Sequence, residues 1–143
     1  MNLERLIGLR EDADLLQHDM GEILKVTQSN YSRWETGRET IPLRKLNMLC
    51  NYFNVSADYI IGLENVLKAT NKTELNLKLV GKRIKEVRRQ KNITQEELAR
   101  VLNTSQSTVS AYESGKTLIL TSFAIQICKT YNISLDWLMG RTN

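Results

Sequence analysis

Apolar residues recur at helical spacing through the second half of the chain. Val80, Ile84 and Val87 stand four and three residues apart, which places them on one face of a helix. The stretch "ITQEELARVL" begins a second helix, because Thr94 is followed three residues later by Glu97, the pattern of a capping box. Strand-like alternation of apolar and polar residues is sustained nowhere. The pattern therefore predicts an all-α fold.

Three more helices are predicted in this half. Ser105 suits the N-cap of a third helix, and Gly115 can take the left-handed conformation that ends it. A fourth helix is expected over about 122–131, and a short fifth helix after the cap residue Ser134. Only "NTS" separates the second helix from the third, so these two helices must turn sharply against each other.

The first half of the chain repeats the second half at a distance of 78 residues. Residues 5–63 align without a gap with residues 83–141, and many pairs that differ in identity keep their polar or apolar character. Two units are too few for a solenoid, which needs at least about three repeats. Roughly 60 residues suffice for a small domain with its own core. We therefore expect two tandem five-helix domains at 1–63 and 79–143, joined by a linker at 64–78.

The composition is that of a folded protein, with 41% hydrophobic and 25% charged residues. No apolar run approaches the roughly 18 to 20 residues that cross a bilayer, and the first residues lack the pattern of a signal peptide. We expect a cytoplasmic protein with no membrane partner. Cys50 and Cys128 also lie 78 residues apart, at equivalent positions of the repeat, which favours core cysteines over a disulfide or a metal pair.

The second and third helices of each domain meet the requirements of a helix-turn-helix motif. Gly21 and Ala99 supply the small side chain needed where the two helices cross. The apolar residues expected to point inward are Met20, Leu24, Tyr31 and Trp34 in the first copy, and Leu98, Leu102, Val109 and Tyr112 in the second. The outward face of the third helix carries Gln28, Ser29, Ser32 and Arg33 in the first copy, and Gln106, Ser107, Ser110 and Ala111 in the second. Such side chains can read base edges in the major groove, where Gln pairs with adenine and Arg with guanine.

Both halves resemble the lambda-repressor-like (Cro or XRE type) helix-turn-helix domain of phage repressors and bacterial regulators. The segments "TQEELARVLNTSQSTVSAYESGK" and "DWLMG" carry the resemblance over 82–140, and the first copy, 5–62, matches less fully. The resemblance implies sequence-specific binding of double-stranded DNA by the third helix. It also implies backbone contacts from the start of the second helix, where Gln17 and Gln95 stand, and a two-fold pair of domains on a palindrome.

The resemblance further implies two structural ion pairs that tie the first helix of each domain to the third. These pairs are Arg10 with Glu35, and Arg88 with Glu113. The first copy departs from the family pattern at several positions: Leu16 replaces the capping Thr, Lys25 replaces Asn in the turn, and Asp12, Asp14 and Asp19 put acid near the path of a phosphate. These departures put the DNA affinity of the first domain in question.

The two halves also differ in charge. Residues 1–63 carry seven Lys/Arg against nine Asp/Glu, a balance of −2, whereas residues 79–143 carry ten against five, a balance of +5. Because phosphate neutralisation supplies most non-specific affinity, the second domain should dominate the encounter with DNA, with Lys116 as a phosphate contact. A basic cluster on or after the first domain's third helix is either part of a DNA surface or a solvated face. Its members are Arg33, Arg38, Arg44 and Lys45.

Nothing in the sequence has the pattern of an enzyme. His18 is the only histidine, it has no matching nucleophile or acid, and there is no glycine-rich phosphate loop and no metal-ligand spacing. We therefore expect a non-enzyme that needs no cofactor and no metal.

The predicted function is a DNA-binding transcriptional regulator, most simply a repressor, whose two domains occupy one asymmetric operator as an intramolecular pseudo-dimer. An apolar loop, with Leu118, Ile119 and Leu120 in one domain and Ile41 and Pro42 in the other, offers an interface, unless it only starts the fourth helix. The alternative is an interaction protein in which the first domain mediates dimerisation or binds a protein partner and only the second domain binds DNA.

Overall fold

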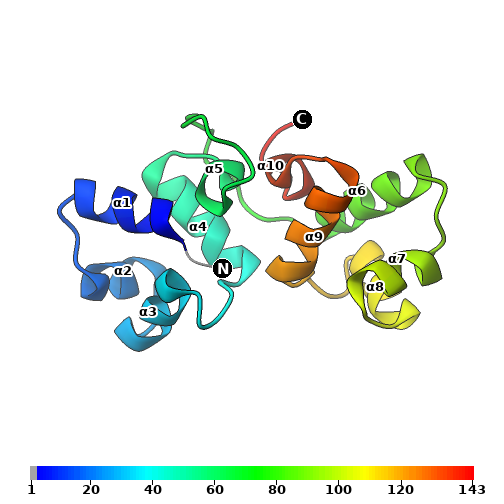
Figure 1. Ribbon diagram of the computed structural model, residues 1–143, viewed down its shortest axis with the longest axis horizontal. Coiled ribbons are helices and arrows are strands. Elements are labelled where there is room, and N and C mark those ends of the chain that lie inside the picture. Colours follow the sequence, from blue (N-terminus) through cyan, green and yellow to red (C-terminus); the bar gives the residue numbers. More distant parts are fainter. Residues whose placement is uncertain (1–2) are drawn as a thin grey trace. The chain divides into compact units, whose positions relative to one another are not determined.

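The computed structural model describes residues 3–143 and divides the chain into two compact units, Met1–Lys72 and Thr73–Asn143. Every regular element within the described residues is a helix (Figure 1). Domain 1 contains α1 (Glu4–Asp12), α2 (Gln17–Leu24), α3 (Gln28–Thr36), α4 (Leu43–Phe53) and α5 (Ala57–Ile61). Domain 2 contains α6 (Leu77–Gln90), α7 (Gln95–Leu102), α8 (Gln106–Glu113), α9 (Thr121–Tyr131) and α10 (Leu135–Leu138). The all-α fold with five helices per domain is confirmed.

The helices of domain 2 begin where the sequence places their caps. Thr94 Oγ1 accepts a hydrogen bond from the Glu97 backbone N–H at 3.1 Å, and the Thr94 N–H donates to Glu97 Oε1 at 3.3 Å, which completes the predicted capping box. Ser105 and Ser134 likewise accept from backbone N–H groups of the helices that follow them. The first helix of this domain starts at Leu77, two residues before the expected domain boundary.

The start of α2 in domain 1 lacks a side-chain cap, because Leu16 has no acceptor atom. Asp19 compensates in part, since its Oδ2 accepts a hydrogen bond from the Leu16 N–H at 2.8 Å. The end of α2 is held by Lys45, whose ammonium group donates to the Leu24 carbonyl oxygen at 2.8 Å. One of the four residues of the basic cluster is therefore used to cap a helix within the domain.

The helix-turn-helix crossing depends on small residues, as expected. A Cβ on Gly21 would lie 2.9 Å from the Val26 carbonyl oxygen, and Ala99 is buried at the same place in domain 2. The turn that follows α2 needs a left-handed residue, and Lys25 adopts it with φ of 59°. Asn103, which tolerates this conformation better, adopts φ of 55° at the equivalent position.

Each domain has its own core beneath its helices. All eight apolar residues expected to point inward from the two motifs are buried, as are Cys50 and Cys128, which are not joined in a disulfide. Ile41 and Ile119 also lie in the cores with 1% and 2% of their surface exposed. Leu120 of the same loop exposes 56% of its surface, and an interface at this loop stays a prediction.

The last helix of each domain is fastened to the first by an arginine. The guanidinium carbon of Arg5 lies 4.5 Å from the Tyr59 ring centroid, and that of Arg83 lies 5.0 Å from the Trp137 ring centroid. Arg5 also donates to the Tyr59 carbonyl oxygen at 2.8 Å. These contacts combine cation–π attraction with hydrogen bonding to the end of the domain.

Part of the linker packs against domain 1. The Lys68 carbonyl oxygen accepts from the Ser56 N–H at 3.2 Å, and Thr70 Oγ1 donates to the Val55 carbonyl oxygen at 3.1 Å. The segment between Thr70 and the start of α6 is therefore only residues 71–76, shorter than the linker expected from the sequence.

Candidate nucleic-acid interface

The outward face of α8 is polar and accessible. Gln106, Ser107 and Ser110 are exposed, and Ala111 is partly exposed beside them. Ser105 Oγ lies 3.0 Å from Ser107 Oγ at the start of the helix. No carboxylate stands among these four positions, because Glu113, the acid of this helix, is turned inward and is 8% exposed. The face therefore offers donors and acceptors without repelling a polyanion.

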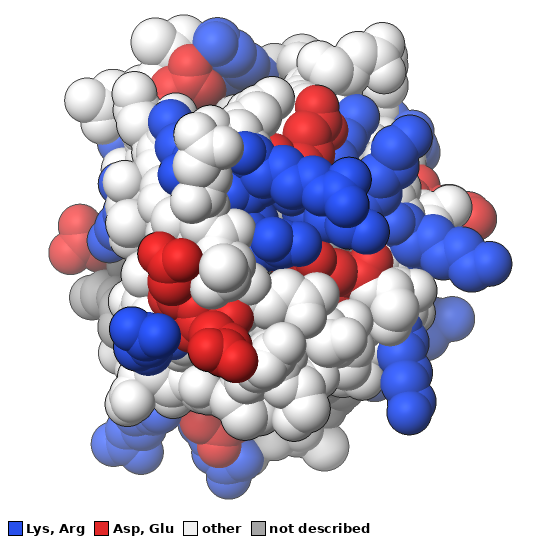
Figure 2. All heavy atoms as spheres, turned by 90° about the vertical axis from the view of Figure 1, so that its right-hand side faces the viewer, with Lys and Arg blue, Asp and Glu red and all other residues white. Residues whose placement is uncertain are grey.

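Basic residues gather on the exterior of domain 2. Figure 2 shows a nearly continuous patch of Lys and Arg side chains on the face that includes this domain. Lys82, Lys85 and Arg89 of α6 line a shallow depression together with Glu86 and Gln90, and Lys116 stands exposed just after α8. This distribution agrees with the balance of +5 counted for residues 79–143.

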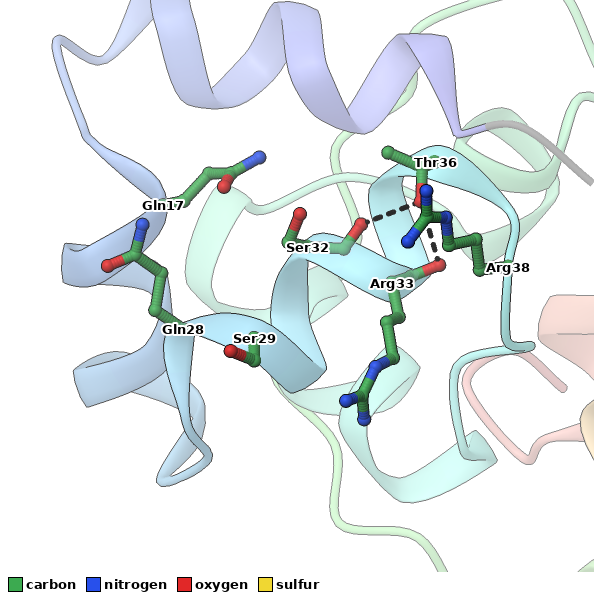
Figure 3. Close-up of a pocket in the computed structure, with 7 residues that line it drawn as sticks. All are labelled: Gln17, Gln28, Ser29, Ser32, Arg33, Thr36 and Arg38. Atoms are coloured by element: carbon green, nitrogen blue, oxygen red, sulfur yellow. Dashed lines mark hydrogen bonds between the residues drawn. The ribbon is translucent and has the colours of Figure 1, made fainter.

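The corresponding surface of domain 1 is concave. A depression of about 630 Å³ is lined by Gln17 from α2, by side chains of α3 and by Arg38 beyond it (Figure 3). Its complete lining is Gln17, Gln28, Ser29, Ser32, Arg33, Thr36 and Arg38. Six of the twelve residues predicted to contact DNA thus meet at one surface, and no carboxylate is among the lining residues. The aspartates that raised doubt about this domain do not line the depression.

Arg33 and Thr36 are held in different ways at this surface. Thr36 Oγ1 donates back to the Ser32 carbonyl oxygen at 3.0 Å. Arg33 Nη1 donates to Asn30 Oδ1 at 3.0 Å and lies 3.7 Å from Glu39 Oε1, but its side chain remains 46% exposed. Such an exposed ion pair is weak and easily exchanged, so Arg33 can turn to another anion.

The predicted ion pairs lie beneath α3 and α8, and both are confirmed. Arg10 Nε donates to Glu35 Oε1 at 2.6 Å, and Arg88 Nε donates to Glu113 Oε2 at 2.7 Å. Burial alone would raise the pKa of the Glu35 carboxyl, but hydrogen bonds from Arg10, Tyr31 and Gln17 outweigh it and lower that pKa. The hydrogen bonds to the carboxylates in turn raise the pKa of each arginine.

The two glutamines expected to contact phosphates are anchored by the same carboxylates. Gln17 Nε2 donates to Glu35 Oε2 at 3.0 Å, and Gln95 Nε2 donates to Glu113 Oε1 at 3.1 Å. Each amide nitrogen carries two hydrogens, so one N–H of the group is engaged by the carboxylate and the other is directed elsewhere. The carboxylates therefore fix the orientation of both glutamine side chains.

The sequence analysis missed two features that support α3 and α8. The Tyr31 hydroxyl donates to Glu35 Oε1 at 2.6 Å, which no residue of domain 2 repeats, because Val109 stands at the equivalent position. Gly81 lies where α6 meets α8, and a Cβ there would come within 2.3 Å of the Tyr112 carbonyl oxygen. Comparison of the two halves gave no sign of this glycine, because the equivalent residue of domain 1 is Leu3.

Neither a metal-binding cluster nor a membrane-spanning helix is found in the part of the chain that the structure describes. Among residues 3–143, no group of three or more His, Cys, Asp or Glu side chains is placed to hold a metal ion. Within the same residues, no helix is long and apolar enough to cross a membrane.

The helix-turn-helix family pattern matches the chain twice, at residues 6–60 and 84–138. The chain belongs to this family, of the Cro/XRE type. Both matches include the second and third helices and the buried ion pair of their domain. The resemblance inferred from the sequence is therefore confirmed for each half separately.

Three curated relatives share about a third of their aligned residues with this helix-turn-helix protein. Antitoxin PezA of Streptococcus pneumoniae is 34% identical over 72 residues, which cover 50% of this chain and 46% of PezA. The HTH-type transcriptional regulator ImmR of Bacillus subtilis is 36% identical over 85 residues, 59% of this chain and 66% of ImmR. The uncharacterized HTH-type transcriptional regulator YobD of Bacillus subtilis is 35% identical over 63 residues, 44% of this chain and 56% of YobD. The chain thus spans about half to two thirds of the relatives it matches.

Solved structures similar to this protein include two helix-turn-helix proteins. The P22 c2 repressor, crystallised with a synthetic operator, is 25% identical with a TM-score of 0.42, and the match covers 45% of this chain and 97% of the repressor. The restriction-modification controller protein C.AhdI of Aeromonas hydrophila is 25% identical with a TM-score of 0.41, covering 44% of this chain and 91% of C.AhdI.

Proposed function

We propose that this protein is a sequence-specific DNA-binding transcriptional repressor whose two domains both contact DNA. The observation that carries the proposal is the absence of any carboxylate from the accessible faces of α3 and α8, although acidic residues are common elsewhere in domain 1. A surface that contacts phosphates and base edges must avoid negative charge, whereas a merely solvated helix face has no such requirement. Membership of a family whose second motif helix enters the major groove supports the same assignment.

The residues divide by the chemistry they offer. Gln28 and Gln106 begin the reading helices and can pair with adenine, and Arg33 can pair with guanine. Ser29, Ser32, Ser107 and Ser110 can donate to or accept from either kind of base, and Ala111 can contact a thymine methyl group. Gln17, Gln95, Arg38 and Lys116 stand at the edges of the reading helices, where they suit contacts to phosphates. The second N–H of each anchored glutamine amide is the donor for such a contact.

The same proposal extends to a pseudo-dimer within one chain. Domains of this kind place their reading helices in successive major grooves about 34 Å apart. Residues 71–76 span roughly 20 Å when extended, so the linker keeps the two domains close enough to occupy adjacent half-sites. Because Arg33 in α3 corresponds to Ala111 in α8, the two half-sites should differ in sequence.

A second candidate function is favoured by a different observation in domain 1. Leu16 exposes 68% of its surface at the start of α2, close in sequence to Asp14 and Asp19, and an exposed leucine there is better suited to a protein surface than to a phosphate. In this alternative, domain 1 dimerises or holds a protein partner and domain 2 alone binds DNA.

Selection of bound duplexes from random DNA, followed by footprinting of the full chain, tests the proposal. Unequal half-sites about 10 base pairs apart, protected by one chain, would support the pseudo-dimer. A single half-site per chain, or a perfect palindrome that two chains occupy through domain 2, would favour the second candidate. Failure to enrich any sequence would refute DNA recognition by both domains.

A further inference from the structure

Four basic residues form a stripe along the solvent-exposed side of α6. Lys78, Lys82, Lys85 and Arg89, here called the α6 stripe, are spaced by four, three and four residues, which aligns them on one face of the helix. The opposite face is the buried one that carries Val80, Ile84 and Val87. Lys78, Lys82 and Arg89 are exposed, and Lys85 is half-buried.

The α6 stripe begins next to the end of the reading helix of domain 2. A Cβ on Gly115 would lie 3.0 Å from Lys78 Cα and 3.1 Å from Lys78 Cγ, so the first lysine of the stripe packs against the second residue after α8. Lys116, a proposed phosphate contact, is the next residue along the chain. The α6 stripe is therefore continuous with the surface proposed to bind DNA.

The fold does not require this charge. The counterparts of Lys82, Lys85 and Arg89 in domain 1 are Glu4, Ile7 and Glu11, and α1 forms the same helix in the same place within its domain. None of the ion pairs found among residues 3–143 uses a residue of the stripe. The positive charge along α6 is thus neither repeated in domain 1 nor used to stabilise domain 2.

We propose that the α6 stripe is a second phosphate-contacting surface, which binds the backbone of the same duplex beyond the half-site read by α8. This inference rests on the proposed function. From Lys78 to Arg89 the helix rises about 17 Å, which matches the length of roughly five base pairs along the duplex axis. Because domain 1 has Glu4 and Glu11 where the stripe has Lys82 and Arg89, only one end of the operator gains these contacts. The α6 stripe therefore extends the footprint on one side and fixes the direction in which the protein lies.

The test compares two double variants of the full chain that lose the same charge. K82Q/R89Q removes two exposed members of the stripe, and K72Q/K129Q removes two exposed lysines from the linker and α9. Binding to the selected operator is measured between 50 and 200 mM salt, and hydroxyl-radical protection is mapped. Neutralising two phosphate contacts should lower the slope of log affinity against log salt by about 1.8, so the loss across this range shrinks about 12-fold. Protection should recede by about five base pairs on the side of domain 2 only.

The outcomes separate the two proposals. If the unaltered protein binds no DNA, the proposed function fails and the role of the α6 stripe falls with it. If the unaltered protein binds but K82Q/R89Q keeps its salt slope and its footprint, the inference about the stripe fails alone. Sedimentation without DNA tests whether the stripe instead binds a second copy of this chain. If the unaltered protein is a dimer, K82Q/R89Q is a monomer and the footprint is unchanged, then the stripe contacts the acidic α1 of a second copy and the inference is overturned. Thermal melting of both variants checks that they remain folded.

Discussion

The Tyr31 hydroxyl donates a hydrogen bond of 2.6 Å to Oε1 of Glu35, the carboxylate that Arg10 also holds. Burial, followed by this hydrogen bond to a negative partner, raises the pKa of Tyr31, so the phenol stays protonated and remains a donor. The Glu35 carboxylate, which ties α1 to α3, thus accepts from one more donor than the Glu113 carboxylate does in domain 2, where Val109 stands in place of Tyr31.

Tyr31→Phe should destabilise domain 1 by about 1.5 to 3 kcal/mol, because the lost hydrogen bond has a charged acceptor. Trp34 is the only tryptophan of domain 1, so its fluorescence in a Trp137→Phe background reports urea unfolding of this domain. The same substitution made together with Glu35→Gln should cost less, and a double-mutant cycle measures the coupling. A cycle that closes with no coupling would contradict the structural role of the hydroxyl.

Domain 1 should lose stability in acid through Glu35. The pKa of this carboxyl is lowered in the folded protein, since hydrogen bonds to Arg10, Tyr31 and Gln17 overcome the effect of burial. The contribution of Glu35 to the free energy of unfolding is therefore complete above the unfolded pKa of about 4.3. It is lost as pH falls through the folded pKa. Urea unfolding followed by Trp34 between pH 7 and pH 3 should show this decline. The Glu35→Gln variant should be less stable at pH 7, but its stability should fall less between pH 7 and pH 3. An equally steep fall in the variant would show that Glu35 is not the group responsible.

Lys25→Asn should stabilise domain 1 by about 1 kcal/mol. Lys25 is held at φ of 59°, a left-handed conformation that costs lysine more than asparagine, whose short polar side chain can hydrogen-bond to the local backbone. The reverse change at the equivalent position, Asn103→Lys, should destabilise domain 2 by a similar amount. Thermal denaturation of the two variants checks both signs, and a destabilising Lys25→Asn would show that the lysine has another role in the turn.

Gly81→Ala should destabilise domain 2 by about 3 kcal/mol, because its methyl group would meet the Tyr112 and Glu113 carbonyl oxygens at 2.3 and 2.7 Å. Gly8→Ala is the matched control. Gly8 also lies inside the first helix of its domain, but a Cβ there meets nothing within 4 Å, so helix propensity should stabilise domain 1 by up to about 1 kcal/mol. Tolerance of Gly81→Ala would mean that α6 can move away from α8.

Arg33→Ala should remove the preference for guanine in one half-site at a cost of about 1 to 3 kcal/mol, while the other half-site keeps its sequence. Arg38→Ala, from the edge of the same concave surface, should weaken binding to all sequences alike. Repeating the selection from random DNA with each variant distinguishes the two effects. A uniform loss of affinity in Arg33→Ala would reassign this arginine to the phosphates.

Much of the fold follows from short stretches of sequence read alone. Thr94, Ser105 and Ser134 fix the starts of helices, because a cap needs only an acceptor side chain two or three residues before a backbone N–H. The spacing of apolar residues identified which side of each helix is buried. The spacing of 78 residues then carried each helix assigned in the second half over to the first half. The family resemblance supplied both ion pairs between distant positions.

Other features arose only when helices distant in sequence came together. Gln17 has the sequence pattern of a first-turn residue of α2, and nothing local shows that its amide meets Glu35 of α3. Lys45 belongs by sequence to a basic cluster, but packing of α4 against α2 turns its ammonium group onto the Leu24 carbonyl oxygen. The sequence by itself determined where helices start, end and face, because these depend on neighbours within a few residues. Only the tertiary structure decided which polar atoms meet across helices, since a hydrogen bond depends on separations of a few tenths of an ångström that no spacing rule specifies.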